Sequence, residues 1–335
     1  MNLLQAIATV GGMTIISRIL GFVRDILVAA VLGAGPLADA FFVAFKMPNL
    51  FRRLFAEGAF NAAFVPQFAG FLEAGGREAA RIFAEQALAV LLWTLLLFVI
   101  IFEMAMPWVI LGFAPGFAAI PEQLSLAVQL TRITFPYLLF ISLISLMSGV
   151  LNSLGRFAAA AATPILLNLC LIGAILWLVR FTPTPAHALA FGVATAGGVQ
   201  FVWVFLHLGK AGMRLRLPAP RLTPPVRTML RRIVPVAIGA GVYQISMLID
   251  TVIASLLPTG SISYLFFADR VNQLPMGVVG VAVGTVNWYV KRLVKKGHIK
   301  VTRLQRRRLR YLITPEGISE KTRLAMEYVK VSMGM

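Results

Sequence analysis

The chain begins with a long apolar stretch, residues 3–32, whose sequence is LLQAIATVGGMTIISRILGFVRDILVAAVL. Aliphatic and small side chains fill it, and its charged residues are Arg18, Arg24 and Asp25. The hydrocarbon core of a bilayer is about 30 Å thick and requires about 20 apolar residues per helix. The stretch is therefore long enough to cross a membrane, and its three charges need an explanation.

The rest of the chain has the same character. Hydrophobic residues make up 59% of the 335 residues and charged residues only 13%, whereas a soluble domain carries roughly 25% charge. Too few polar side chains are present to cover a surface that faces water, which excludes a soluble enzyme. Cys170 is the single cysteine, which excludes a disulfide framework. The composition predicts an all-α polytopic membrane protein.

Hydropathy and length predict eight membrane spans, at residues 3–32, 37–60, 83–108, 123–151, 158–180, 186–208, 233–256 and 262–285. We expect the first to be bent or broken at its glycines, and the second to be broken at Met47-Pro48, because proline lacks a backbone donor. After this break, residues 49–57 are typical of a short amphipathic helix on which Arg53 and Glu57 are spaced to form a pair.

Basic residues between the spans predict the orientation. If the N-terminus is inside, the internal connections hold thirteen basic residues and the external ones about one, a strong positive-inside bias. The thirteen are Lys46, Arg52, Arg53, Arg77, Arg81, Arg156, Lys210, Arg214, Arg216, Arg221, Arg227, Arg231 and Arg232. We expect both termini to lie in the cytoplasm.

The spans fall into two groups. Residues 1–208 hold six spans and form a first transmembrane lobe, and a basic, proline-rich cytoplasmic linker follows at 209–232. Residues 233–285 hold two further spans, and the first of them opens with breaker residues much as the first span does. This favours an internal repeat, with a complete six-helix unit and the beginning of a second.

Several charges lie inside the predicted spans, where each costs several kcal/mol, with estimates from about 2.5 to more than 10. They are Arg18, Arg24, Asp25, Asp39, Lys46, Arg132, Asp250, Asp269 and Arg270. Some of these charges have simpler interpretations. Arg24, like Arg52 after the second span, can extend to the interface, and Asp25 and Asp269 can neutralise the arginines beside them. Together, several arginines that open into one cavity indicate a site for an anionic group such as phosphate. A lipid with a pyrophosphate head would fit it.

No motif for a nucleotide, a metal or a catalytic cysteine competes with this interpretation, and the three histidines are dispersed. We therefore expect a non-enzymatic protein without a cofactor.

Five motifs resemble the MurJ/MviN lipid II flippases of the MOP superfamily. They are SRILGFVRD (17–25), DAFFVAFKMPN (39–49), RRLFAEGAF (52–60), TFPY (134–137) and YLFFADR (264–270). The resemblance covers about residues 1–285. It implies a MOP-type fold in a bacterial inner membrane, here the first six-helix lobe and two helices of the second. It also implies export of undecaprenyl-pyrophosphate-linked peptidoglycan precursor (lipid II) from the inner to the outer leaflet by alternating access.

The resemblance also implies roles for residues. Arg18, Arg24, Arg52 and Arg270 occupy the positions of the family's pyrophosphate-binding arginines. The neighbouring motif positions, for gating or charge balance, are Asp25, Asp39, Asn49, Arg53, Glu57 and Asp269. With only two helices of the second lobe, such a chain is expected to lack half of the alternating-access machinery and to be inactive alone.

Residues 286–335 depart from the family. They carry 13 Lys and Arg against 3 Asp and Glu. Their pattern predicts a helix at 286–297, strands at 298–301 and 309–313, and a helix from Thr314, and it resembles the C-terminal half of a MarR-type winged-helix regulator. Because the front half of such a domain is missing, we interpret the tail as a fused fragment or a sequence artefact and expect no specific DNA binding.

Two alternatives stay open at this point. One is a membrane-tethered DNA-binding regulator that uses the basic tail. The other is a flippase for a different polyprenyl-linked glycan, with the same membrane lobe. Membrane lipids are expected partners in every case.

Overall fold

The computed structural model describes residues 3–52, 59–271, 299–305 and 308–313. Its helices and strands are α1 (Leu3–Leu32), α2 (Pro36–Arg52), α3 (Ala59–Met104), α4 (Met106–Phe113), η2 (Pro115–Ala119), α5 (Pro121–Thr134), α6 (Tyr137–Ser153), α7 (Phe157–Leu176), η3 (Leu178–Phe181), α8 (Pro185–Lys210), α9 (Pro224–Ser255), β1 (Ile299–Gln305) and β2 (Arg308–Ile313). Residues 261–271 are helical as well. The chain divides into two compact parts, Met1–Phe267 and Ala268–Met335.

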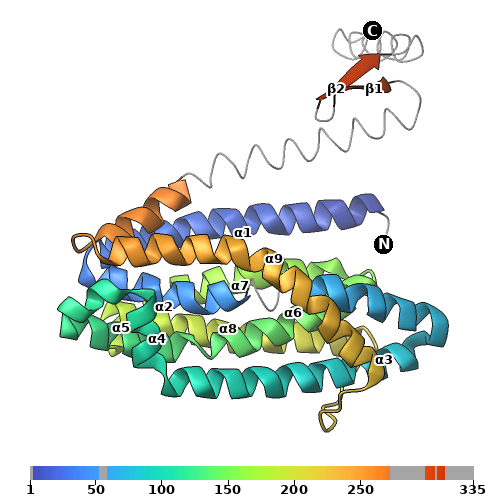
Figure 1. Ribbon diagram of the computed structural model, residues 1–335, viewed down its shortest axis with the longest axis horizontal. Helices are drawn as coiled ribbons and strands as arrows, with labels where there is room; N and C mark the ends of the chain where they lie inside the picture. The colour runs from blue at the N-terminus through green and yellow to red at the C-terminus, as the bar shows by residue number, and fades with distance from the viewer. Residues whose placement is uncertain (1–2, 53–58, 272–298, 306–307, 314–335) are drawn as a thin grey trace. The chain divides into compact units, whose positions relative to one another are not determined.

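The first part is a bundle of long helices that run side by side (Figure 1). The helix α1 packs on α7, α7 on α8, α8 on α6, α6 on α3, and α3 on α9. Within the bundle, α2 contacts α5, α6 and α8 and is buried continuously from Ala38 to Phe45. This part of the second predicted span therefore lies in the interior of the lobe.

The expected membrane architecture is confirmed in outline. Within the part of the chain that the structure describes, four helical stretches are long and apolar enough to cross a membrane: Phe60–Met104, Pro121–Ser153, Phe157–Leu176 and Pro185–Lys210. Proline opens α2, α5, α8 and α9, where its missing N–H would have no partner in any case. Large apolar side chains remain exposed on the bundle, for example Ile19 on α1 and Leu97 on α3, as expected for a surface in lipid.

The predicted break in α2 is wrong. The helix continues through Pro48 to Arg52. Proline cannot donate to the carbonyl four residues earlier, which belongs to Ala44. The Thr134 hydroxyl in α5 donates to this carbonyl instead, at 2.9 Å. A neighbouring helix thus replaces the lost hydrogen bond and keeps the helix intact.

The helix α1 was expected to be bent or broken at its glycines, yet it is one uninterrupted helix from Leu3 to Leu32. A single glycine costs a helix only about 1 kcal/mol, and nothing lies within 4 Å of a side chain added at Gly11 or Gly12. The expected break at the glycines is therefore wrong.

Two connections between spans are also helical, contrary to expectation. Residues 61–82 belong to α3, whose interruption is Gly76, with φ 69° and ψ −167°, a conformation that glycine tolerates best. The linker predicted at 209–232 ends early, because α9 begins at Pro224. Hydropathy alone missed both segments because they carry charged residues.

The second part contains the predicted hairpin. The strands β1 and β2 pair antiparallel, with Ile299 opposite Ile313 and Val301 opposite Tyr311. The helices predicted at 286–297 and after Thr314 lie outside the described residues.

Candidate functional site

Arg24 and Asp25 form the first polar cluster, on α1. The Arg24 side chain is buried, and its Nε and Nη2 donate to Asp25 Oδ1 at 3.0 and 2.6 Å. Its Nη1 donates to Asn168 Oδ1 in α7 at 2.8 Å. A buried arginine with a carboxylate and an amide as partners satisfies the usual condition for placing a charge inside an apolar bundle.

Asn168 was not among the residues singled out from sequence. It is buried, and its Nδ2 donates to the backbone carbonyl of Ser17 at 2.9 Å. Its only signal in the sequence is a polar amide within the apolar stretch 158–180. Such an amide more often mediates helix packing than ligand binding, so the pattern alone did not distinguish it.

Asp39 forms the second cluster, on α2. Its buried carboxylate accepts from the backbone N–H of Gly260 at 2.6 Å, and from the backbone N–H and hydroxyl of Ser263 at 2.8 and 2.5 Å. Gly260 and Ser263 flank the start of the helix at 261–271, so the carboxylate satisfies N–H groups at the positive end of a helix dipole. Asp39 thus joins α2 to the turn after α9.

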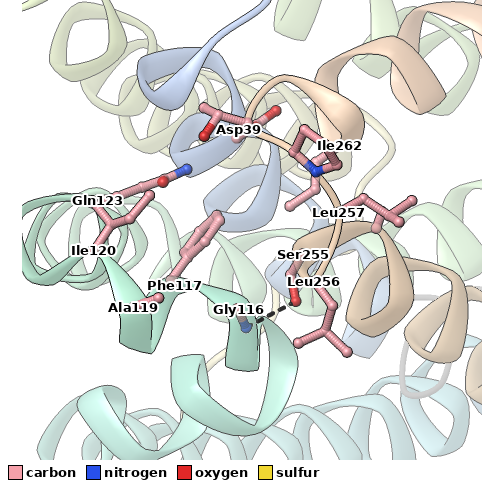
Figure 2. A pocket seen from close by; sticks show the side chains of 13 residues that line it. Asp39, Gly116, Phe117, Ala119, Ile120, Gln123, Ser255, Leu256, Leu257 and Ile262 are labelled. Atoms are coloured by element: carbon pink, nitrogen blue, oxygen red, sulfur yellow. Dashed lines mark hydrogen bonds between the residues drawn. The ribbon is translucent and has the colours of Figure 1, made fainter.

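A cavity of about 300 Å³ adjoins this junction. It is lined by residues of α2, η2, α5, the end of α9 and the turn that follows, and Figure 2 shows Asp39 on one side and Gly116 facing Ser255 on another. The Gly116 backbone N–H donates to Ser255 Oγ at 3.2 Å. A Cβ at Gly116 would lie 1.7 Å from the Ser255 carbonyl oxygen, so only glycine allows this approach.

Two further contacts join α9 to α2 and the linker after α8 to α3. Lys46 Nζ, on α2, donates to Thr251 Oγ1, on α9, at 3.4 Å. Glu85, on α3, accepts from the backbone N–H of Arg216 at 2.8 Å and pairs with Arg81. The linker after α8 is therefore fixed to the bundle by its backbone.

The other predicted site residues occupy varied environments. Arg18 lies exposed on α1, and Arg52 ends α2 half-buried. The Asn49 amide donates to the Phe45 carbonyl of its own helix at 2.7 Å. Arg53 and Glu57, with their predicted pair, lie outside the described residues. Asp269 and Arg270 are helical and belong to the second part of the chain.

Comparison with known proteins shows the family of the chain. The sequence model described as lipid II flippase MurJ matches residues 28–288. The chain belongs to the MurJ family. A probable lipid II flippase MurJ of Rhizobium tropici is 48% identical over 322 residues, which cover 93% of this chain and 60% of that protein. The lipid II flippase MurJ of Burkholderia cenocepacia is 39% identical over 290 residues, covering 85% and 56%. The chain thus spans little more than half the length of these MurJ relatives.

Solved structures agree with the MurJ assignment. A lipid II flippase MurJ in an inward closed conformation matches with a TM-score of 0.68 and 27% identity, covering 85% of this chain and 58% of that one. An outward-facing MATE transporter of the MOP superfamily matches with a TM-score of 0.56 at 18% identity, which shows the shared fold alone. This MurJ-family chain is therefore a multi-pass membrane protein with a MOP-type fold.

Proposed function

We propose that the chain takes part in moving lipid II, an undecaprenyl-pyrophosphate-linked precursor, from the inner to the outer leaflet of the membrane. Family membership supports the cargo class, and the observation that carries the proposal is the buried guanidinium of Arg24. An arginine cannot lose its proton at physiological pH and grips phosphate oxygens through paired N–H groups. A buried cation of this kind suits an anionic head whose tail stays in lipid.

In this proposal Arg18, Arg24, Arg52 and Arg270 bind the pyrophosphate. The residues proposed for gating and charge balance are Asp25, Asp39, Asn49, Arg53, Glu57 and Asp269. Asp25 has the clearest support, because it holds two N–H groups of Arg24. Asp25 also offsets the charge of Arg24 while the head group is absent.

Asp39 and Gly116 support a gate at one end of the lobe. Asp39 joins α2 to Gly260 and Ser263. The backbone of Gly116 packs directly against the backbone of Ser255. Both contacts involve segments predicted to be external, at 109–122 and 257–261. We infer that this gate is closed on the external side, with both termini in the cytoplasm.

The proposed organisation keeps a first lobe at residues 1–208, a linker that ends where α9 begins at Pro224, and the first two helices of a second lobe up to residue 285. Alternating access would then open and close contacts such as Lys46 with Thr251, which joins α2 of the first lobe to α9 of the second.

Photo-crosslinking tests the proposed cargo. Lipid II with a photoreactive group near its pyrophosphate is added to the purified chain in detergent, and the labelled peptides are identified by mass spectrometry. We expect labelling of α1 around Arg18 and Arg24, with competition by undecaprenyl pyrophosphate and none by undecaprenol. Labelling spread over lipid-facing peptides without competition would contradict the proposal.

The same experiment separates the possible cargoes. A polyprenyl-pyrophosphate carrying a different glycan serves as the second competitor. Stronger competition by this lipid than by unlabelled lipid II would assign the site to another glycan and contradict lipid II as the cargo.

A further inference from the structure

Asn168 makes an unusual bridge between α7 and α1. It is 4% exposed, and its two amide atoms contact two different positions of α1. Its Nδ2 donates to the Ser17 carbonyl at 2.9 Å, while its Oδ1 accepts from Arg24 Nη1 at 2.8 Å. These positions lie seven residues apart, or about two helical turns. One side chain therefore contacts both the backbone of α1 at Ser17 and the side chain of Arg24.

The Ser17 bond fixes which amide atom faces Arg24. A carbonyl oxygen only accepts, so the amide nitrogen must face Ser17 and the amide oxygen must face the guanidinium. Gly21 lies between the two contacts on α1, and a Cβ there would come within 3.5 Å of Asn168 Nδ2. This is an ordinary van der Waals distance, so the Asn168 amide packs directly against α1 at Gly21.

The partners of the Arg24 guanidinium differ in charge as well as in geometry. A guanidinium has five N–H donors, and the bonds to Asp25 and Asn168 use three of them. Asp25 orients Arg24 but also cancels its charge. Asn168 orients the same group without adding a negative charge, which leaves N–H groups on Nη1 and Nη2 for an anion.

We propose that Asn168 is a positioning residue that holds the Arg24 guanidinium in the orientation that presents its remaining N–H groups to the pyrophosphate of the cargo. The inference rests on the proposed function, which supplies the anion. It predicts that Asn168 acts through Arg24 alone and makes no contact with the lipid tail.

Two substitutions separate its possible roles. Asn168→Leu keeps the size and removes both hydrogen bonds. Asn168→Asp keeps an acceptor for Arg24, loses the donor to Ser17 and adds a second carboxylate beside the cation. Gln200→Leu is the matched control, because Gln200 is a buried amide in α8 that donates to the Thr163 carbonyl of α7 at 2.6 Å.

The first measurement needs no lipid. The full chain in detergent is treated with phenylglyoxal, and the modification rate of Arg24 is followed by peptide mass spectrometry. We expect Asn168→Leu to increase this rate about tenfold, the effect of one hydrogen bond to a charged group, and Gln200→Leu to leave it unchanged. An unchanged rate in Asn168→Leu, or an equal increase in Gln200→Leu, would overturn the inference.

The second measurement is the affinity for undecaprenyl pyrophosphate. We expect binding about tenfold weaker for Asn168→Leu, and at least as weak for Asn168→Asp because of its added charge. If Asn168→Leu does not fold, the affinity of the isosteric Asn168→Asp for undecaprenyl pyrophosphate still tests the positioning role. Wild-type affinity in both variants would overturn the positioning role while the proposed function stands. Absence of binding by the wild-type chain would overturn the proposed function itself.

Discussion

Asp39 and Ser263 lie 224 positions apart in the sequence, yet the Asp39 Oδ1 atom accepts both the backbone N–H and the hydroxyl of Ser263. The other carboxylate oxygen accepts the Gly260 N–H at 2.6 Å. One buried carboxylate therefore binds the start of the helix at 261–271 to α2. The proposed external gate depends on this junction.

Replacing Asp39 by Asn should weaken the junction. The amide nitrogen would face a backbone N–H, so one donor loses its acceptor in a buried site. We expect the free energy of unfolding in detergent to fall by about 2 kcal/mol, the usual cost of a lost hydrogen bond to a charged group together with an unsatisfied donor. Asp250→Asn is the control, because Asp250 is exposed on α9, and a change of less than about 0.5 kcal/mol is expected there. Equal effects of the two substitutions would contradict a role for Asp39 in the junction.

A second prediction concerns the contact of Gly116 with Ser255. Gly116→Ala places a Cβ 1.7 Å from the Ser255 carbonyl oxygen, so η2 and the end of α9 must separate. We expect a loss of about 2 kcal/mol or more in stability, as in other overpacked contacts. A cysteine at position 262, in a chain with Cys170→Ser, should then react faster with a maleimide, because Ile262 lines the adjoining cavity.

Gly112→Ala is the matched control for this experiment. Gly112 lies in α4, and no atom lies within 4 Å of a Cβ added there. Alanine is the better helix former by about 1 kcal/mol, so this change should be neutral or slightly stabilising. Faster labelling of position 262 in both variants would show that the approach of Gly116 to Ser255 does not close the gate.

A third prediction concerns the linker after α8. Glu85→Ala removes the acceptor of the Arg216 backbone N–H and the partner of Arg81. The linker should then leave α3 more often, and trypsin should cleave at Arg214 and Arg216 several times faster. Glu73→Ala, at an exposed position of the same helix, should leave the cleavage rate unchanged. An unchanged rate in Glu85→Ala would show that other contacts fix the linker.

The fourth prediction tests orientation. Single cysteines at Ala34 and Arg214, both exposed, are introduced in a chain with Cys170→Ser. In spheroplasts, an impermeant maleimide should label position 34 directly and position 214 only after the membrane is opened, as the positive-inside bias predicts. The reverse pattern would place the gate on the cytoplasmic side and the termini outside the cell, which contradicts the proposed orientation.

The sequence predicted the membrane class and most helices because hydropathy and length decide these features. It misplaced helix ends where charge hides a helix, as at residues 61–82 and 224–232. It also predicted a break at Pro48, because the Thr134 hydroxyl that repairs the helix comes from α5, 86 positions away. A tertiary hydrogen bond of this kind leaves no local pattern.

The charged residues of the candidate site were visible in the sequence because charges in apolar stretches are rare. Their neutral partners were not. Asn168 and Ser263 are ordinary polar residues of membrane helices, and Gly116 is one of 28 glycines. Only the fold shows that Asn168 accepts a hydrogen bond from Arg24, that Ser263 donates to Asp39 and that Gly116 approaches Ser255.

The most direct test of the central claim is the equilibrium affinity of the purified chain for lipid II, compared with that of Arg24→Gln. The substitution keeps a polar side chain and removes the cation that the proposal assigns to the pyrophosphate. We predict saturable binding by the wild-type chain, and binding at least tenfold weaker for Arg24→Gln, the loss of about 1.4 kcal/mol or more. Equal affinity of the two chains, or binding that never saturates in either, would contradict a pyrophosphate site at Arg24.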